Sequence, residues 1–505
     1  MTLVESHSGV RGTAKVLMPV IPAYALSYGQ WLRKRSMAPT VIIGHDPRPS
    51  CEQIMQSLMG HLGRDVRVVD IGVVTTPMLE HTVREEAAHG GVMLTASHNP
   101  LHHNGFKFLR EDGALLAPDD MAGVIGRAHE LMGEGVDGVG AGVDGMGAVR
   151  VARVRSNPGS SYLDFVLSLL PGGTLDDVRS FYADKRVILD PNGGAACGLC
   201  DVLRLGMGIP LEVIHGSVAR GPQRGIEPNG RTLAAIVSTL GPKDLYVGFD
   251  FDADRAELGI PVGSKFASEF GQVVSGQYVL GLMTEYVLGR KGAATGPNEN
   301  VLDAQLVNVP GIGIRNRTIV VNDGTSWLVK DVARRHGGRY VEVGTGEINV
   351  VDTMIDQHAA LSGDGSSSGF IHPATRCRDG VMTWLYTLAL TAERGQDVGG
   401  LLDSMPRYYT LRDDDQRCEP NQEAVARVMG ALQDYYSGRG YELSRPDRFS
   451  GLKVIMDEGW VWFRASATTA GQFRIYSDAR SKPAAEQLLE DGRAAYKQAV
   501  DATRD

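Results

Sequence analysis

Three aspartates alternate directly after an apolar run. Residues 248–258 have the sequence GFDFDADRAEL, which places Asp250, Asp252 and Asp254 on one short segment. Carboxylates this close repel one another, so a fold that gathers them needs a cation, and an all-oxygen ligand set suits Mg²⁺. An EF-hand is excluded because Arg255 stands where its loop needs glycine and Pro261 where it needs glutamate. A solvated acidic turn is the alternative, but the apolar flanks favour the metal site.

A serine in a second segment could supply a nucleophile. LTASHNP, residues 94–100, follows the apolar run GGVML and presents Ser97 between Ala96 and His98. A serine-hydrolase elbow is excluded because the G-x-S-x-G pattern is absent. Two interpretations stay open. Ser97 carries a phosphoryl group whose charge the Asp-bound Mg²⁺ neutralises, or it is a turn or helix-capping serine.

Both segments follow runs that are typical of buried strands, and helical patterns separate these runs. The pattern predicts a mostly parallel α/β architecture, in which ligands bind at the carboxyl ends of strands. A final segment with half-exposed strands and one long helix predicts a smaller α+β domain. We place domain boundaries near residues 155, 263 and 395, the first just after the glycine-rich stretch 133–149. The predicted domains are 1–155, 156–263, 264–395 and 396–505.

Composition excludes several classes of protein. The 505 residues carry a formal net charge of −9 without a dense block of lysine and arginine, which argues against nucleic acid as a partner. No apolar run is long enough for a membrane span, and no secretory signal is visible, so we expect a cytoplasmic protein with no membrane partner. Neither a Walker A pattern nor a dinucleotide-binding glycine turn occurs, so a kinase or dehydrogenase has no support.

The two segments together resemble the α-D-phosphohexomutase superfamily. TASHNPLHHNGFKF is similar to the superfamily's phosphoserine loop, and DFDADR is similar to its magnesium loop; the two occur in the superfamily's order. Further matches extend over nearly the whole chain: SGVRGT, GHDPRPS, LDPNGGAA, VGTGEINVVDTM and RDGVMTWLYTLAL. The resemblance implies three mixed α/β domains and a smaller C-terminal α+β domain around a central active-site cleft.

The resemblance also implies catalytic roles. Ser97 would be the phosphoryl carrier and, with the three aspartates, a ligand of one Mg²⁺ ion. Arg11 and Arg255 would stabilise the transferred group. Lys107, which matches the loop lysine, would move the hydroxyl proton if burial among cations lowers its pKa. His98 is a second candidate for this step, with a hydrogen-bonded scaffold role as the alternative.

Two predicted substrate loops depart from the superfamily's pattern. SGDGSSSGFIHP, residues 362–373, replaces the sugar-binding Gly-Glu loop, with Asp364 or Ser366 at the glutamate position and Ser368 nearby. Glu347 in GEINV is either a further sugar contact or a carboxylate that stabilises a helix start. RASATTAGQFR, residues 464–474, replaces the RPSGTEP phosphate loop and retains a set of cations and hydroxyls. This predicted phosphate-binding set is Arg464, Ser466, Thr468 and Arg474.

We therefore predict a Mg²⁺-dependent isomerase that interconverts the 1- and 6-phosphates of glucose or mannose. The reaction would pass through a phosphoserine and a hexose 1,6-bisphosphate, which would also be the activator. A glucosamine phosphate, or the sugar phosphate of an unusual pathway, is an alternative substrate. A net phosphatase and an inactive sugar-phosphate-binding protein are alternatives from other classes. The expected partner is a small-molecule sugar phosphate, and the chain would be a monomer or a homodimer.

Overall fold

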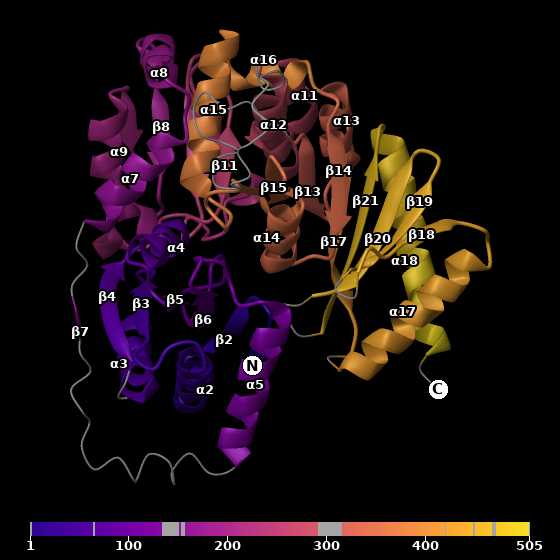
Figure 1. Ribbon diagram of the computed structural model, residues 1–505. Coiled ribbons are helices and arrows are strands. Elements are labelled where there is room, and N and C mark those ends of the chain that lie inside the picture. Colours follow the sequence, from indigo (N-terminus) through magenta and orange to yellow (C-terminus); the bar gives the residue numbers. More distant parts are fainter. Residues whose placement is uncertain are drawn as a thin grey trace.

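The described residues form four β-sheets, and each is the centre of one domain (Figure 1). The computed structural model describes residues 3–63, 66–133, 151–152, 157–290, 316–419, 421–447, 450–466 and 471–503. Most of the glycine-rich stretch 133–149 therefore lies outside the described residues. The boundaries near 155, 263 and 395 stay predictions. The described helices include none that is both long and apolar enough to span a membrane.

The first sheet has seven strands in the order β1-β2-β6-β5-β3-β4-β7. Strands β3, β4, β5 and β7 run parallel, whereas β6, β2 and β1 add antiparallel pairs at one edge. Alternate residues of β3 face opposite cores: Val41 and Ile43 pack with helices α2, α3 and α5, and Ile42 packs with α4. The elements are β1 (Val4–Ser6), β2 (Gly9–Thr13), α1 (Ala14–Leu17), α2 (Ile21–Arg33), β3 (Thr40–His45), α3 (Cys51–His61), β4 (Arg67–Val73), α4 (Thr76–Glu85), β5 (Gly90–Leu94), β6 (His103–Arg110), α5 (Pro118–Gly133) and β7 (Val151–Ala152).

The second sheet has the order β12-β11-β10-β8-β9, with β8, β9 and β10 parallel. Strand β10 ends directly before the aspartate segment, and β11 leaves it antiparallel to β10. Strand β12 pairs with β11 although it lies beyond residue 263. The elements are α7 (Pro158–Ser168), α8 (Thr174–Tyr182), β8 (Val187–Asp190), α9 (Cys200–Met207), β9 (Leu211–Val213), α10 (Gly230–Val237), β10 (Leu245–Phe249), β11 (Ala256–Gly259), α11 (Lys265–Phe270) and β12 (Val273–Val274).

The third sheet has the order β14-β13-β15-β16, and only its β15–β16 pair is antiparallel. Helix α15 begins after Asp379, whose side chain accepts a hydrogen bond from the backbone N–H of Met382 at 2.9 Å and caps the helix. The elements are α12 (Gly276–Gly289), β13 (Thr318–Asn322), α13 (Trp327–Arg335), β14 (Arg339–Val343), α14 (Glu347–Asp356), β15 (Leu361–Asp364), β16 (Gly369–Ile371), α15 (Gly380–Arg394) and α16 (Val398–Asp403).

The fourth sheet is fully antiparallel, in the order β17-β21-β20-β19-β18. Helices α17 and α18 cover one face with a separate apolar core, and the other face turns Trp460, Trp462 and Tyr476 towards Trp327 of the third domain. The elements are β17 (Tyr409–Arg417), α17 (Gln422–Ser437), β18 (Glu442–Ser444), β19 (Leu452–Met456), β20 (Gly459–Ala465), β21 (Gln472–Ala479) and α18 (Lys482–Ala502).

The predicted α/β architecture is confirmed. The runs TVIIGHD, VRVVDIGVV, GGVML, KRVILD, LYVGFD and RTIVVND, which are typical of buried strands, form β3, β4, β5, β8, β10 and β13, and the C-terminal segment forms the α+β domain. One apolar core continues through the first three domains, with Leu79, Leu189 and Val320 among its members. The fourth domain joins the third through the aromatic contact with Trp327 and through polar contacts, such as the 3.0 Å hydrogen bond from the indole of Trp462 to Asp323.

Candidate active site

The serine and aspartate segments meet between the first two domains. Ser97 follows β5, and its hydroxyl donates a hydrogen bond to Asp250 Oδ2 over 3.0 Å. Ser97 is buried and has a φ of +49°, a left-handed conformation that non-glycine residues rarely adopt. Its backbone N–H donates to Thr95 Oγ1 at 2.8 Å, and the Thr95 hydroxyl donates to Asp46 at 2.7 Å. The surrounding loop thus holds Ser97 in a conformation that costs free energy.

A buried arginine from the GHDPRPS segment organises this loop. The guanidinium of Arg48 donates to the backbone carbonyls of Ser97 and Asn99 at 2.6 and 2.7 Å, and to those of Pro100 and His103 at 2.6 and 3.1 Å. Its Nε lies 3.0 Å from Asp46 Oδ2. From the sequence, this segment was only a match to the superfamily's pattern. The role of Arg48 follows from its hydrogen-bond partners, which lie about fifty residues away along the chain.

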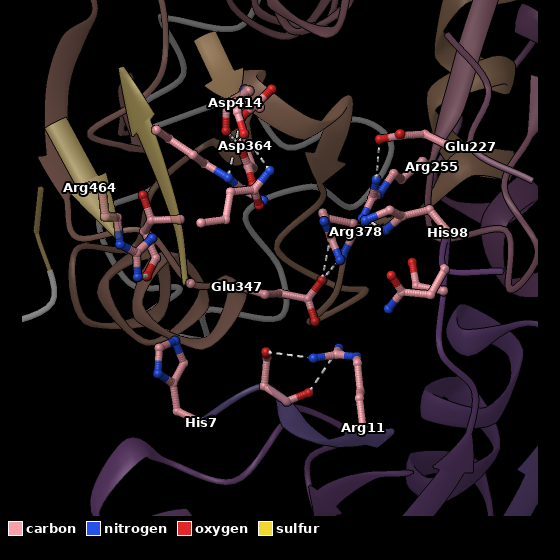
Figure 2. A pocket seen from close by; sticks show the side chains of 18 of the residues that line it. His7, Arg11, His98, Glu227, Arg255, Glu347, Asp364, Arg378, Asp414 and Arg464 are labelled. Atoms are coloured by element: carbon pink, nitrogen blue, oxygen red, sulfur yellow. Dashed lines mark hydrogen bonds and ion pairs between the residues drawn. The ribbon is translucent and has the colours of Figure 1, made fainter. Parts of the chain in front are cut away.

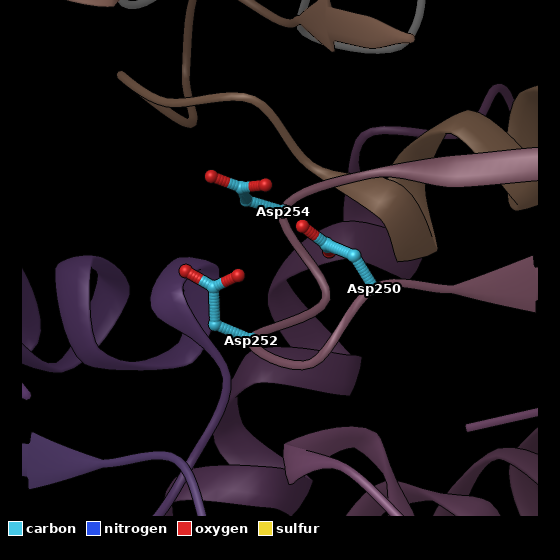
Figure 3. Close-up of side chains that lie close together, drawn as sticks. All are labelled: Asp250, Asp252 and Asp254. Carbon is cyan, nitrogen blue, oxygen red and sulfur yellow. The ribbon is translucent and has the colours of Figure 1, made fainter. Parts of the chain in front are cut away.

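The three aspartates form a buried cluster on the loop between β10 and β11 (Figure 3). Asp250, Asp252 and Asp254 each offer an oxygen within 4.8 Å of the others. Among the described residues, Oδ1 of Asp252 and Oδ1 of Asp254 have no hydrogen-bond partner although both are buried. Burial and the neighbouring carboxylates raise the pKa of Asp250 well above its ordinary value. Arg255 Nε lies 3.5 Å from Asp254 Oδ1. Buried carboxylate oxygens that accept no hydrogen bond fit a hard cation, and complete burial does not fit a solvated acidic turn.

Lys107 lies beside this cluster. We predicted that cations would surround it, but the groups nearest to its ammonium are carboxylates. Its Nζ is 3.0 Å from Asp252 Oδ2 and 3.3 Å from Asp254 Oδ2. Burial by itself would lower the pKa of Lys107, but the attraction of Asp252, Asp254 and Glu347 outweighs it and raises the pKa. The expectation that neighbouring cations lower this pKa is therefore wrong, because carboxylates are the nearest charged groups.

His98 and Arg255 form a pair across the two segments. Arg255 Nη2 lies 2.9 Å from His98 Nδ1. A guanidinium can only donate, so Nδ1 accepts and the neutral imidazole carries its proton on Nε2. Burial, Arg255 and Arg11 together lower the pKa of His98 well below its ordinary value. Arg11, from β2, donates to the hydroxyl and the carbonyl of Ser8 at 3.3 and 3.2 Å.

All four domains contribute to one cavity of about 400 Å³ beside Ser97 (Figure 2). Ten of the predicted site residues line it: Arg11, Ser97, His98, Lys107, Arg255, Glu347, Asp364, Ser366, Arg464 and Arg474. Ser368 and Ser466 are described but are not among the lining residues, and Thr468 lies outside the described residues. The tertiary structure therefore brings together residues from the catalytic, sugar and phosphate predictions.

Arg378 joins the predicted groups, and our sequence reasoning did not single it out. Its Nη2 is 2.7 Å from Asp254 Oδ2 and its Nε is 2.8 Å from Glu347 Oε2. Glu347 is also the first residue of α14 and lines the cavity, so it lies at a helix start as expected, and its contact with a sugar stays a prediction. The only signal for Arg378 was its place in RDGVMTWLYTLAL, directly before the helix-capping Asp379.

The predicted sugar loop is internally hydrogen-bonded at the end of β15. Asp364 Oδ1 accepts from Asn322 Nδ2 at 2.7 Å, and from the hydroxyl and N–H of Ser366 at 2.6 and 3.0 Å. Ser368 donates to Glu257 of β11, which ties the loop to the second domain. Asp364 and Ser366 thus reach the cavity, whereas Ser368 turns to a neighbouring strand.

The fourth domain places arginines at the far end of the cavity. Arg464 on β20 and Arg474 on β21 are paired in register, and Arg464 Nη2 donates to the carbonyl of Thr345 at 3.3 Å. Arg474 Nε lies 3.4 Å from Asp414 Oδ1. Asp414 and Arg412 also line the cavity, and our sequence reasoning missed both. They come from β17, whose register shifts between Asp413 and Gln416, an irregularity of the kind common beside active sites.

Comparisons with known proteins find relatives that match over nearly the whole chain. Two family models match: the phosphoglucomutase/phosphomannomutase alpha/beta/alpha domain I over residues 4–132 and domain III over residues 276–409. A phosphoglucomutase/phosphomannomutase of Thermococcus kodakarensis is 26% identical over 494 residues, which are 96% of each chain. A probable phosphoglucosamine mutase of Methanopyrus kandleri is also 26% identical, over 96% of this chain and 95% of its own.

Solved structures share the complete fold. A phosphoglucomutase/phosphomannomutase family protein from Burkholderia thailandensis superposes with a TM-score of 0.71 at 19% identity, covering 97% of this chain and 96% of that one. The N-acetylphosphoglucosamine mutase of Aspergillus fumigatus, solved with GlcNAc-6P and magnesium, has a TM-score of 0.60 at 13% identity, covering 99% and 96%. At these identities the structures establish the four-domain fold.

Proposed function

Because this chain belongs to the α-D-phosphohexomutase superfamily, we propose that it is a Mg²⁺-dependent isomerase of hexose phosphates that uses Ser97 as its phosphoryl carrier. The observation that carries the proposal is the hydrogen bond that joins Ser97, which lines the cavity, to the fully buried aspartate cluster next to it. A pure binding protein needs neither a nucleophile nor a metal beside it. Residues of all four domains also line the cavity. A site that holds both ends of a hexose bisphosphate needs binding groups on opposite sides, and the four domains supply them.

The aspartate cluster is the proposed site of Mg²⁺, with Asp250, Asp252, Asp254 and an oxygen on Ser97 as ligands. When bound, the ion would offset negative charge that develops on the transferred phosphoryl oxygens. Arg255 and Arg11 line the cavity beside Ser97 and would contact the same group. Their role is electrostatic, since phosphoryl transfer depends mainly on positioning and charge.

The reaction would proceed in two matched halves. The bond between phosphorus and Ser97 Oγ breaks while a bond forms to the free hydroxyl of the sugar monophosphate. The resulting hexose 1,6-bisphosphate then returns its other phosphoryl group to Ser97. In the first half one proton moves from the sugar hydroxyl to Ser97 Oγ, and we assign this movement to Lys107 Nζ, which gives one proton and takes the other. Arg255 keeps His98 neutral and in place, which favours a scaffold role for this histidine.

The non-reacting end of the substrate would lie against the third and fourth domains. Arg464 and Arg474 supply guanidinium groups for its phosphate, with Ser466 and Thr468 as the hydroxyls of the predicted loop. Glu347, Asp364 and Ser366 supply oxygens for sugar hydroxyls. Ser368 would stabilise this loop rather than contact the sugar, because its hydroxyl donates to Glu257.

Glucose and mannose phosphates are our first proposal for the substrate, and a glucosamine phosphate is the second. The second is favoured by the GEINVVDTM segment, which places the Glu347 carboxylate on the cavity wall, and by the relative named as a probable phosphoglucosamine mutase. A carboxylate can accept hydrogen bonds from an amino group as well as from hydroxyls.

The test is a ³¹P NMR time course with Mg²⁺ and a trace of hexose 1,6-bisphosphate, run in parallel with glucose, mannose and glucosamine 1-phosphates. We expect a 6-phosphate signal with wild type and with the exposed control Ser160→Ala, and none with Ser97→Ala. The sugar that reacts fastest identifies the preferred substrate. Release of free phosphate alone would favour the phosphatase instead. No turnover of any of the three sugars would contradict the proposal and point to a binding protein.

A further inference from the structure

The first turn of α4, which belongs to the first domain, contacts the aspartate cluster of the second domain. The backbone N–H of Thr76 donates to the carbonyl of Asp252 at 3.0 Å, and the Thr76 hydroxyl donates to Asp252 Oδ2 at 2.8 Å. Thr76 has no exposed surface. The preceding residue, Thr75, caps the helix through its own hydroxyl, which accepts from the N–H of Met78 at 3.2 Å. The Thr76 side chain is therefore available for Asp252.

These contacts distinguish the two carboxylate oxygens of Asp252. Oδ2 accepts from Thr76 Oγ1 and from Lys107 Nζ, 3.0 Å away. Oδ1 is buried and has no hydrogen-bond partner among the described residues. Lys107 Nζ also lies 3.5 Å from Thr76 Oγ1, so the hydroxyl oxygen faces an ammonium and its hydrogen is directed to Asp252. One face of the carboxylate is thereby occupied, and the other stays bare.

We propose that Thr76 is a positioning residue for the metal centre: its hydroxyl and N–H hold Asp252 so that Oδ1 faces the cation. The proposal rests on the metal site of the proposed function. Outer hydrogen-bond partners of this kind orient metal ligands, and their loss typically weakens metal affinity about 10- to 100-fold. Thr76 belongs to the first domain and Asp252 to the second, so the contact also makes metal affinity depend on how these two domains meet.

Thr76→Val is the informative variant, because valine has nearly the same shape and lacks the hydroxyl. Thr76→Ser retains the hydroxyl and should rescue the defect. Thr82→Val is the matched control: Thr82 is a buried threonine on the same helix, and its hydroxyl donates to the carbonyl of Met78 at 2.8 Å rather than to the aspartate loop. Thr76→Ala removes the same hydroxyl and serves as the second variant if Thr76→Val does not fold.

The measurement is Mn²⁺ binding to the full, substrate-free chain, followed by electron paramagnetic resonance. We expect Thr76→Val to bind Mn²⁺ about 10- to 100-fold more weakly than wild type, with Thr76→Ser and Thr82→Val close to wild type. In steady-state assays the Mg²⁺ concentration at half-maximal rate should rise, while the KM for the sugar phosphate stays unchanged.

Three outcomes would overturn the inference, and each has a different meaning. Equal Mn²⁺ affinity of Thr76→Val and wild type would reject the role of Thr76 and leave the proposed function intact. Failure of wild type itself to bind Mn²⁺ or Mg²⁺ would reject the metal site on which both proposals depend. Equal loss of affinity in Thr76→Val and Thr82→Val would assign the effect to the helix and reject the specific contact.

Discussion

Ser97 Oγ lies 3.0 Å from Asp250 Oδ2, although 153 residues separate the two along the chain. Each residue stands at the carboxyl end of a strand, Ser97 after β5 and Asp250 after β10. The contact therefore fixes how the first two domains face each other, because both strand ends must reach the same point. The hydroxyl that we propose as the nucleophile and the carboxylates that we propose as metal ligands thereby share one site.

The first prediction concerns the state of Ser97. If it carries the phosphoryl group, intact-mass analysis of wild type should show the added mass of one phosphoryl group, and Ser97→Ala should lack it. Ser160→Ala, which changes an exposed serine on α7, should retain it. Peptide mapping should place the group on the peptide that contains residues 94–100. An unmodified Ser97→Ala protein with full activity would rule out this residue as the carrier.

Asp252→Asn tests the metal centre. The substitution preserves size but replaces one buried oxygen with an amide that cannot ligate a hard cation as a carboxylate does. Because a metal stabilises phosphoryl transfer by several kcal/mol, we expect kcat/KM to fall by about 100-fold or more, with only partial recovery at high Mg²⁺. Asp201→Asn, on the exposed face of α9, is the control. Chelation should abolish wild-type turnover, and an unchanged Mg²⁺ dependence of Asp252→Asn would contradict the site.

Arg48→Lys tests how the serine loop is held. Lysine retains the charge but cannot replace a planar fork that donates to four carbonyls and to Asp46. We expect a loss of about 3 kcal/mol in stability and a lower kcat with a smaller change in KM. Thermal unfolding and steady-state kinetics measure these effects, with the exposed Arg35→Lys as control. Wild-type kcat in Arg48→Lys would show that the loop keeps its conformation without this arginine.

Arg474→Gln tests the phosphate end of the cavity. A charge-assisted hydrogen bond to phosphate contributes about 1.5–3 kcal/mol, so kcat/KM should fall roughly 10- to 100-fold, mainly through KM. Arg427→Gln on α17 removes a half-exposed cation from the same domain and should have no such effect. If KM is the same in Arg474→Gln and wild type, the phosphate must bind elsewhere.

Asp478 predicts a pH dependence of stability at the junction of the third and fourth domains. Burial raises its pKa to about 6, although the Thr410 hydroxyl and the N–H of Trp327 donate to its carboxylate at 2.7 and 3.0 Å. The folded pKa exceeds the unfolded value near 4, so the folded state binds more protons between these values. The stabilisation is present below about pH 4 and is lost as the pH rises to about 6, with an amplitude on the order of 3 kcal/mol.

The check is thermal unfolding between about pH 4 and pH 7, with Asp478→Asn compared against wild type. We expect the variant to show a shallower decline over this interval, whatever its absolute stability. The exposed Asp457→Asn is the control and should follow wild type. A parallel decline in Asp478→Asn would assign the pH dependence to other groups.

Much of the fold could be predicted because its signals are local. The runs that became β3, β10 and β13 are largely apolar and lead directly into Asp46, Asp250 and Asp323, so sequence alone indicates where each of these strands stops. The aspartate cluster is local in the same sense. Residues 250–254 follow a strand in a single turn, and no arrangement of the domains can separate their carboxylates.

The partners of these residues could not be predicted, because they come from distant parts of the chain. Arg378 contacts Asp254 from 124 residues away, and Asp414, which lies where the register of β17 shifts, is 3.4 Å from Arg474. The pKa of Lys107 is raised rather than lowered for the same reason, because the direction of the shift depends on which charged groups pack nearest to the ammonium.

The sequence by itself determined the strand ends and singled out the serine that we propose as the nucleophile and the three aspartates that we propose as metal ligands, since each depends on residues that are neighbours along the chain. Only the tertiary structure decided that Ser97 faces Asp250, that Thr76 holds Asp252 and that Arg378 joins Asp254 to Glu347. Those pairings depend on how separate sheets pack, which is set by burial and charge summed over the whole molecule rather than by any local pattern.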